Sequence, residues 1–246
     1  MFDITYYVLL ALAVLITLSI HELSHGYAAY KLGDPTAKNL GRLTLNPIKH
    51  IDPIGALCML FFRFGWAKPV PINMRYFKNP RRDFAITALA GPLSNLILAF
   101  ISGFIYLLVY ALCRDMIFVE KDFVFYLLQN TLNFFFILHS VNVGICIFNL
   151  IPVPPLDGSR LLTALLPPKI YFKIMRNERY IYIGFLVWLL LGSYVSYALL
   201  SVPFIAGNSV LSAIAKVFSL SDMISYLIGL VSDGILNLFR LIPFLR

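Results

Sequence analysis

Charged residues are scarce in this chain, because Asp, Glu, Lys and Arg make up only 13% of its 246 residues. Soluble domains carry about 25%. Hydrophobic residues account for 60% of the sequence, and the mean hydropathy is +0.82. This composition excludes an ordinary soluble globular domain and indicates an integral membrane protein.

Cysteine is also sparse. Cys58, Cys113 and Cys146 are isolated and show no Cys-x-x-Cys spacing, which excludes a disulfide framework and a cysteine-based zinc site.

A basic region is missing from the amino end, so we expect the first apolar run to stay in the protein as a membrane span and not to be cleaved as a signal peptide.

Long apolar runs are the main feature of the sequence. A helix needs about 20 apolar residues to cross a bilayer. Runs of this kind cover residues 4–30, 84–112, 123–150 and 181–200, and a weaker one at 223–239 contains Asp233. They predict an all-α polytopic membrane protein, with a three-helix core over 1–166 that includes a loop at 31–83, and carboxy-terminal helices over 167–246 that could gate access.

The basic residues gather in two of the connections between these runs. They are Lys31, Lys38, Arg42, Lys49, Arg63, Lys68, Arg75, Lys78, Arg81 and Arg82 in the first, and Arg160, Lys169, Lys173, Arg176 and Arg179 in the second. Cytoplasmic loops carry such an excess of Lys and Arg. We therefore expect both loops in the cytoplasm and the amino terminus outside. Topology and contact with anionic lipid explain the net charge of +8 without a nucleic-acid partner.

The sequence His21-Glu22-Leu23-Ser24-His25 ends the first apolar run. Two histidines four residues apart lie on one helix face and can bind a single Zn²⁺, while the glutamate can act as general base on its water. Ionisable groups in a membrane span are costly and usually functional. The alternative is two histidines satisfied by backbone carbonyls.

A catalytic zinc usually has three protein ligands. Asp157 is the best-placed third ligand, because the predicted topology brings the end of the third run to the same depth as the histidines. Three prolines end that run, and Gly158 permits a tight turn or a close backbone approach. Alternatively, Asp157 caps a short helix over 159–166.

Together these residues resemble the site-2 protease family of intramembrane zinc metalloproteases. His-Glu-x-x-His is followed by Asn-x-x-Pro-x-Pro-x-Leu-Asp-Gly at 149–158, and Gly91-Pro92-Leu93-Ser94-Asn95 is similar to a Gly-x-x-x-Asn motif of that family. The resemblance implies one zinc ion per chain on His21, His25 and Asp157, with Glu22 as the general base.

The resemblance further suggests that Asn95 and Asn149 position the substrate or the oxyanion. Asn149 could instead bond the carbonyls freed by Pro152, and Asn95 could form an interhelical hydrogen bond beside Gly91. Many relatives have a PDZ-like insertion or a nucleotide-sensing domain, and we expect neither here, since the longest polar segment is the 31–83 loop.

That loop contains a short membrane-associated segment that reads as a β-hairpin, with residues 56–62 and 67–72 on either side of Phe64-Gly65-Trp66. Its edge could pair with extended substrate. Alternatively, its aromatic residues anchor the loop at the headgroups.

Two further histidines are expected to be structural. We expect His139, near the middle of the third run, to bond a neighbouring helix, and His50, in the basic loop, to be solvated.

The sequence and the resemblance together predict an intramembrane metalloprotease near the cytoplasmic face of a prokaryotic cytoplasmic membrane, and the resemblance implies a role in regulated intramembrane proteolysis. Its expected substrates are single-pass membrane proteins or peptides that resemble signal peptides. A zinc transporter would not need Glu22 and would spread its ligands along a path across the bilayer, and a non-catalytic adaptor would be expected to lose Glu22 or a ligand.

Overall fold

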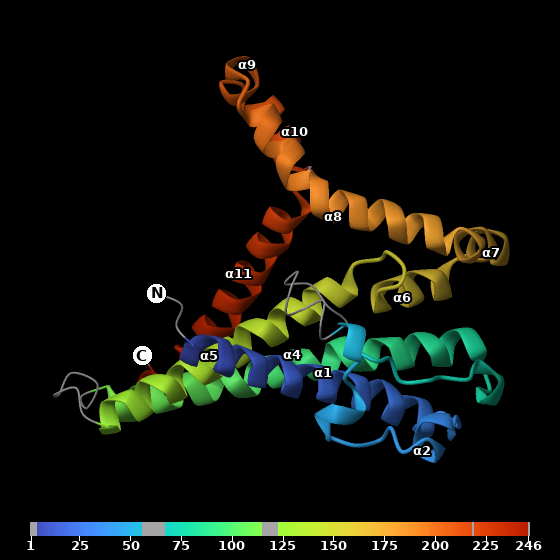
Figure 1. The fold of residues 1–246 in the computed structure, drawn as a ribbon, viewed down its shortest axis with the longest axis horizontal. Coiled ribbons are helices and arrows are strands. Elements are labelled where there is room, and N and C mark those ends of the chain that lie inside the picture. Colours follow the sequence, from blue (N-terminus) through green and yellow to red (C-terminus); the bar gives the residue numbers. More distant parts are fainter. Residues whose placement is uncertain (1–3, 56–66, 115–122, 218, 246) are drawn as a thin grey trace. The chain divides into compact units, whose positions relative to one another are not determined.

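The structure is a computed structural model that describes residues 4–55, 67–114, 123–217 and 219–245. Helices account for most of this part of the chain (Figure 1). They are α1 (Ile4–Lys31), α2 (Thr36–Asn39), α4 (Pro80–Cys113), α5 (Phe123–Leu150), α6 (Asp157–Leu165), α7 (Pro168–Arg176), α8 (Glu178–Leu200), α9 (Pro203–Ala206), α10 (Ser209–Val217) and α11 (Leu220–Phe239). Short 3-10 turns lie at Pro47–Lys49, Met74–Tyr76 and Pro243–Leu245.

Five of these helices, α1, α4, α5, α8 and α11, are long and apolar enough to cross a membrane. The all-α polytopic prediction is thereby confirmed, including the weaker fifth run. The helix ends differ from the predicted ones where charge or proline meets an apolar run. α4 begins at Pro80, before the predicted residue 84, and the Asp83 carboxylate accepts the Asn79 N–H at 3.0 Å. Proline suits a first helical turn, whose N–H groups have no partner within the helix.

The described chain forms two compact units, which are considered separately. The first unit consists of Met1–Cys146 and Ser232–Arg246, and the second of Ile147–Val231. The predicted division at residue 166 stays a prediction.

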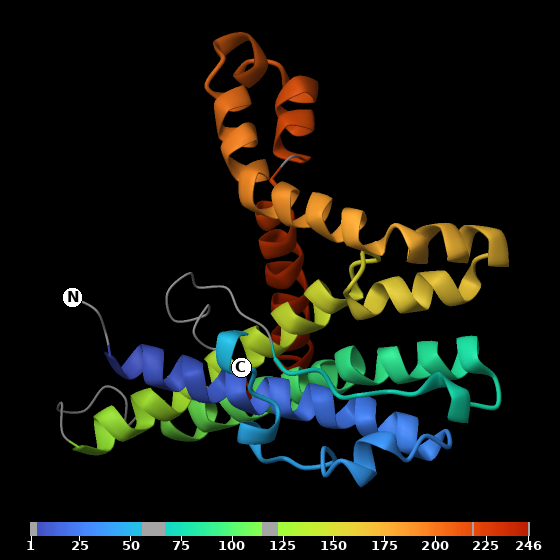
Figure 2. The same cartoon turned by 45° about the vertical axis from the view of Figure 1, so that its right-hand side comes forward.

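In the first unit α1, α4 and α5 run side by side (Figures 1 and 2). Small and polar residues join them, as expected where lipid provides no hydrophobic drive for helix association. Asn142 on α5 donates to Thr17 Oγ1 on α1 at 2.9 Å, and both side chains are fully buried. An apolar cluster of Ala13, Ile137 and Leu138 extends the same contact.

The end of α11 joins this unit through His139, as expected for a histidine that bonds neighbouring helices. The ring is fully buried; its Nδ1 lies 2.9 Å from the Ala99 carbonyl oxygen on α4, and its Nε2 lies 2.7 Å from Ser232 Oγ on α11. Gly103 makes room for the ring, because a Cβ there would lie 2.9 Å from His139 Nδ1.

The second unit packs α10 against α8. Ser193 on α8 lies 2.7 Å from Ser221 Oγ on α11, and a salt bridge of 2.8 Å joins Arg160 on α6 to Glu178 on α8. Both interactions connect α8 to another helix of the unit.

The predicted β-hairpin falls largely on residues 56–66, which lie outside the described residues. Around them, Ile51 and Ala67 form an isolated antiparallel bridge, and the Lys68 N–H donates to the His50 carbonyl at 2.8 Å. The hairpin and its pairing with substrate stay predictions.

Candidate metal centre

His21 and His25 lie on one face of α1, as their spacing predicted. Both side chains are buried, and their Nε2 atoms are 3.0 Å apart. Two nitrogens bound to one tetrahedral Zn²⁺ at about 2.0–2.1 Å stand about 3.3 Å from each other. The two rings therefore converge on a point that suits a single zinc ion.

The His25 ring is oriented by α4. Its Nδ1 lies 2.8 Å from the carbonyl oxygen of Thr87, which can only accept, so Nδ1 carries the ring proton. The Nε2 of a neutral imidazole then presents a lone pair. Metal-binding histidines almost always donate their other N–H in this way. The hydrogen bond thus supports the predicted ligand role of His25.

Glu22, which follows His21 on α1, is held by the extended segment after residue 67. Its Oε2 accepts the backbone N–H of Val70 at 2.8 Å. Since a carboxylate has two oxygens, one can be fixed by the backbone while the other exchanges a proton. Sequence reasoning missed Val70, because nothing in a 48-residue separation indicates the contact.

Asn95 and Gly91 on α4 reach the histidines directly. The Asn95 side chain is fully buried, and its Nδ2 lies 3.1 Å from His21 Nδ1. A Cβ on Gly91 would lie 2.6 Å from His21 Cε1 and nearer still to His25 Nε2. The expected interhelical bond of Asn95 is therefore present, and its partner is one of the proposed ligands.

The three described carboxylates of the 31–83 segment are engaged locally. Asp34 is fully buried and accepts from the Thr36 N–H at 2.9 Å and the Asn73 N–H at 2.6 Å. Asp52 accepts from the N–H groups of residues 54 and 55, and Asp83 from the N–H that precedes α4. These bonds give each carboxylate a structural role in the loop.

Asn149 and Asp157 belong to the second unit. Asn149 lies in the last turn of α5, and Asp157 is the first residue of α6, which begins two residues before the predicted 159. The close backbone approach expected at Gly158 is confirmed, since a Cβ there would lie 2.6 Å from the Ile151 carbonyl oxygen. The proline-rich turn thus folds back tightly on the end of α5.

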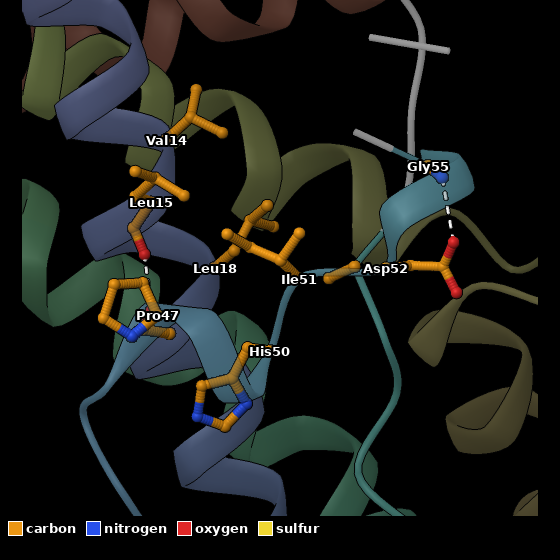
Figure 3. Close-up of a pocket in the computed structure, with 10 residues that line it drawn as sticks. Val14, Leu15, Leu18, Pro47, His50, Ile51, Asp52 and Gly55 are labelled. Carbon is orange, nitrogen blue, oxygen red and sulfur yellow. Dashed lines mark hydrogen bonds between the residues drawn. The ribbon is translucent and has the colours of Figure 1, made fainter. Parts of the chain in front are cut away.

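A small cavity of about 80 Å³ lies beside α1, between Val14, Leu15 and Leu18 and the segment that contains His50 (Figure 3). The prediction that His50 is solvated is wrong, because only 2% of the residue is exposed. Its Nε2 donates to the Thr44 carbonyl at 2.8 Å, and its ring faces an apolar helix surface. This contact holds the loop against α1 just before the histidine motif.

The donor set of the first unit fits a zinc ion. Two imidazole nitrogens converge, one with its proton fixed on the far nitrogen, and a carboxylate stands next to them in the sequence. This is the nitrogen-rich, buried environment in which Zn²⁺ is bound.

Comparison with known proteins agrees with a zinc site in this chain. The model of peptidase family M50 matches residues 9–193, which contain all three motifs. The chain is 43% identical over 212 residues to "Putative zinc metalloprotease YwhC" of Bacillus subtilis, covering 85% of this chain and 90% of the relative. It is 29% identical over 167 residues to "Putative zinc metalloprotease Rip2" of Mycolicibacterium smegmatis, covering 66% of this chain and 59% of the relative.

No solved structure matches the chain. The family match spans most of the sequence, and the first relative aligns over nearly its whole length. The chain is thus an integral membrane protein that belongs to peptidase family M50, the site-2 protease family of zinc metalloproteases.

Proposed function

We propose that this protein is an intramembrane metalloprotease that hydrolyses a peptide bond within a membrane-spanning segment of another protein. The observation that carries the proposal is the convergence of His21 Nε2 and His25 Nε2, 3.0 Å apart at the end of an apolar helix, with Glu22 fixed beside them by Val70. A hydrolase needs this combination of metal ligands and a positioned base.

One zinc ion per chain would be held by His21, His25 and Asp157. The choice of Asp157 rests on the second motif of the family and on the prolines that precede it. It is supported by Asp34, Asp52 and Asp83, whose carboxylates are committed to backbone N–H groups of the loop. Three protein ligands leave a fourth position for water, as a catalytic zinc site requires.

When bound, Zn²⁺ supplies Lewis acidity that lowers the pKa of a water toward about 7 and polarises the scissile carbonyl. Glu22 takes the proton from the attacking water and returns it to the leaving amine, so the reaction needs no covalent intermediate. The bond from Val70 fixes one carboxylate oxygen and leaves the other for the exchange of the proton. Asn149 would bind the substrate backbone or the oxyanion.

The substrates would be single-pass membrane proteins or peptides that resemble signal peptides. We place the site near the cytoplasmic face of a prokaryotic cytoplasmic membrane, because the loops rich in Lys and Arg follow α1 and α5. Regulated intramembrane proteolysis is the process in which such an activity would serve.

The test uses the full chain in lipid vesicles with a single-pass model substrate. We expect the wild-type protein to contain one zinc ion per chain and to cleave the substrate, and a chelator to stop cleavage reversibly. Glu22→Gln should keep its zinc and lose cleavage by at least about 100-fold. Glu178→Gln, the same change in the Arg160 salt bridge, is the matched control. Cleavage by Glu22→Gln at the wild-type rate would contradict the proposal.

A further inference from the structure

Asn95 occupies an unusual place for a polar side chain in a membrane helix. It is fully buried on α4, one turn after Gly91, and its amide group faces His21. Its Nδ2 lies 3.1 Å from His21 Nδ1, while its Oδ1 has no hydrogen-bond partner among the described residues. A buried amide oxygen without a partner costs free energy, so the side chain is suited to a second orientation.

Three hydrogen bonds connect Asn95, His21, His25 and Thr87 in that order, and each residue donates to the next. The Asn95 amide donates to His21 Nδ1, His21 Nε2–H donates to His25 Nε2, and His25 Nδ1–H donates to Thr87. Each neutral imidazole carries one proton, so this pattern puts the His21 proton on Nε2. The Nε2 of His25 then carries a lone pair and no proton, whereas the Nε2 of His21 carries the proton.

Binding of one metal ion by both Nε2 atoms requires the other arrangement at His21. One proton must leave Nε2 and one must arrive at Nδ1, both through solvent, so that the ring stays neutral. The new Nδ1–H then needs an acceptor. The Asn95 NH₂ group cannot accept, but a half-turn of the amide puts Oδ1 in its place.

We propose that Asn95 is a positioning residue of the metal centre, whose Oδ1 accepts the Nδ1–H of His21 and so fixes the tautomer and ring orientation in which His21 binds zinc. This rests on the proposed function, because it assumes that His21 is a ligand. It assigns Asn95 to the support of the metal ligands, in place of contact with substrate or oxyanion. The complete burial of Asn95 and its contact with His21 favour this role.

Gly91 makes the arrangement specific. The His21 ring is confined on the α4 side, since even a methyl group at Gly91 would lie 2.6 Å from its Cε1. The ring therefore cannot swing toward α4 to find another acceptor, and Asn95, one turn further along the same helix, is the group that meets Nδ1. Partners of this kind typically change metal affinity by about 10- to 100-fold when removed.

The test measures zinc affinity, by competition with a chromophoric chelator, and the absorption spectrum of the Co²⁺-substituted full chain. Asn95→Leu, which removes the acceptor, should weaken zinc binding about 10- to 100-fold. Asn95→Asp, which can only accept, should bind zinc at least as tightly as the wild type and should still cleave the model substrate within about tenfold of its kcat. Asn142→Leu is the control, because Asn142 is equally buried but bonds Thr17 and not a histidine.

An oxyanion or substrate role predicts the opposite pattern. A donor to substrate would be lost in Asn95→Asp, so kcat would fall to the level of Asn95→Leu while zinc affinity stayed unchanged in both variants. That result would overturn the proposal. Should Asn95→Leu fail to fold, the comparison of Asn95→Asp with the wild type still decides between the two roles. A wild-type protein that binds neither zinc nor Co²⁺ would overturn both this proposal and the proposed function.

Failure of proteolysis alone is distinguishable from failure of the positioning role. Zinc affinity is measured without substrate, so a chain that binds zinc in an Asn95-dependent manner but cleaves nothing would retain the positioning role and lose the protease assignment.

Discussion

Glu22 on α1 accepts a hydrogen bond of 2.8 Å from the backbone of Val70, 48 residues later in the chain. The proposed base is therefore held by two parts of the protein, the helix α1 and an extended segment of the loop between α1 and α4. A misplacement of about 1 Å in a catalytic group can cost roughly 100-fold in rate, so under the proposed function the loop would contribute to catalysis through its backbone N–H.

Val70→Pro tests this bond, because proline has no N–H. Val70 already precedes Pro71, and this position favours extended backbone, which proline also adopts. We expect kcat to fall by roughly 10- to 100-fold, with zinc content unchanged. Val70→Ala keeps the N–H and is the matched control. Equal activity of the two variants would show that the backbone bond does not position Glu22.

Gly91→Ala should weaken zinc binding, because the added Cβ would overlap both histidine rings. The rings are held by Thr87 and Asn95, so they cannot move aside freely. We expect a loss of affinity of at least about tenfold, comparable to the loss of a group that orients a ligand. Gly184→Ala on α8 is the control, since a Cβ there meets nothing within 4 Å, and it should leave zinc affinity unchanged.

Ser232→Ala should loosen the carboxy-terminal part of α11 without touching the metal centre. The change removes the 2.7 Å partner of His139 Nε2. Interhelical hydrogen bonds in membranes contribute about 0.6 kcal/mol on average, so the free energy of unfolding in detergent should fall by about that amount. Zinc affinity should match the wild type. A large loss of zinc would mean that the His139 tie is coupled to the metal centre.

The orientation can be tested by labelling single cysteines in a background without the native ones. Asn39→Cys lies after α1, and Arg114→Cys follows α4; both positions are exposed. An impermeant maleimide should label residue 39 only from the cytoplasmic side and residue 114 only from outside, because loops rich in Lys and Arg are generally retained in the cytoplasm. The reverse pattern would place the metal centre near the outer face.

The long helices could be predicted because the length and composition of each apolar run identify it as a membrane span. The residues at which the helices begin and end were harder to predict. α4 begins at Pro80, where Arg81 and Arg82 break the apolar run but not the helix, and the proline and the Asp83 bond define the start. The fate of His50 was missed because its charge-rich neighbourhood suggests solvent, whereas burial depends on how the loop folds back on α1.

One part of the metal centre could likewise be predicted from the sequence, and another part could not. The pairing of His21 with His25 is local and follows from helix geometry alone. The contacts to Thr87 and Asn95 depend on how α4 is rotated against α1, which no pattern within either helix specifies. The Gly-x-x-x-Asn motif pointed to this helix but not to its role, and only the distances indicate that the motif faces the histidines.

The contact at Gly91 has a mechanical consequence. α1 and α4 approach each other there through two imidazole rings and a bare backbone, so the distance between the helices is set by the same side chains that would hold the metal. A bound metal ion would fix the positions of both rings, and separating the two helices at this point would break the contacts that Thr87 and Asn95 of α4 make with them. We therefore expect α1 and α4 to move together if a substrate segment enters the protein.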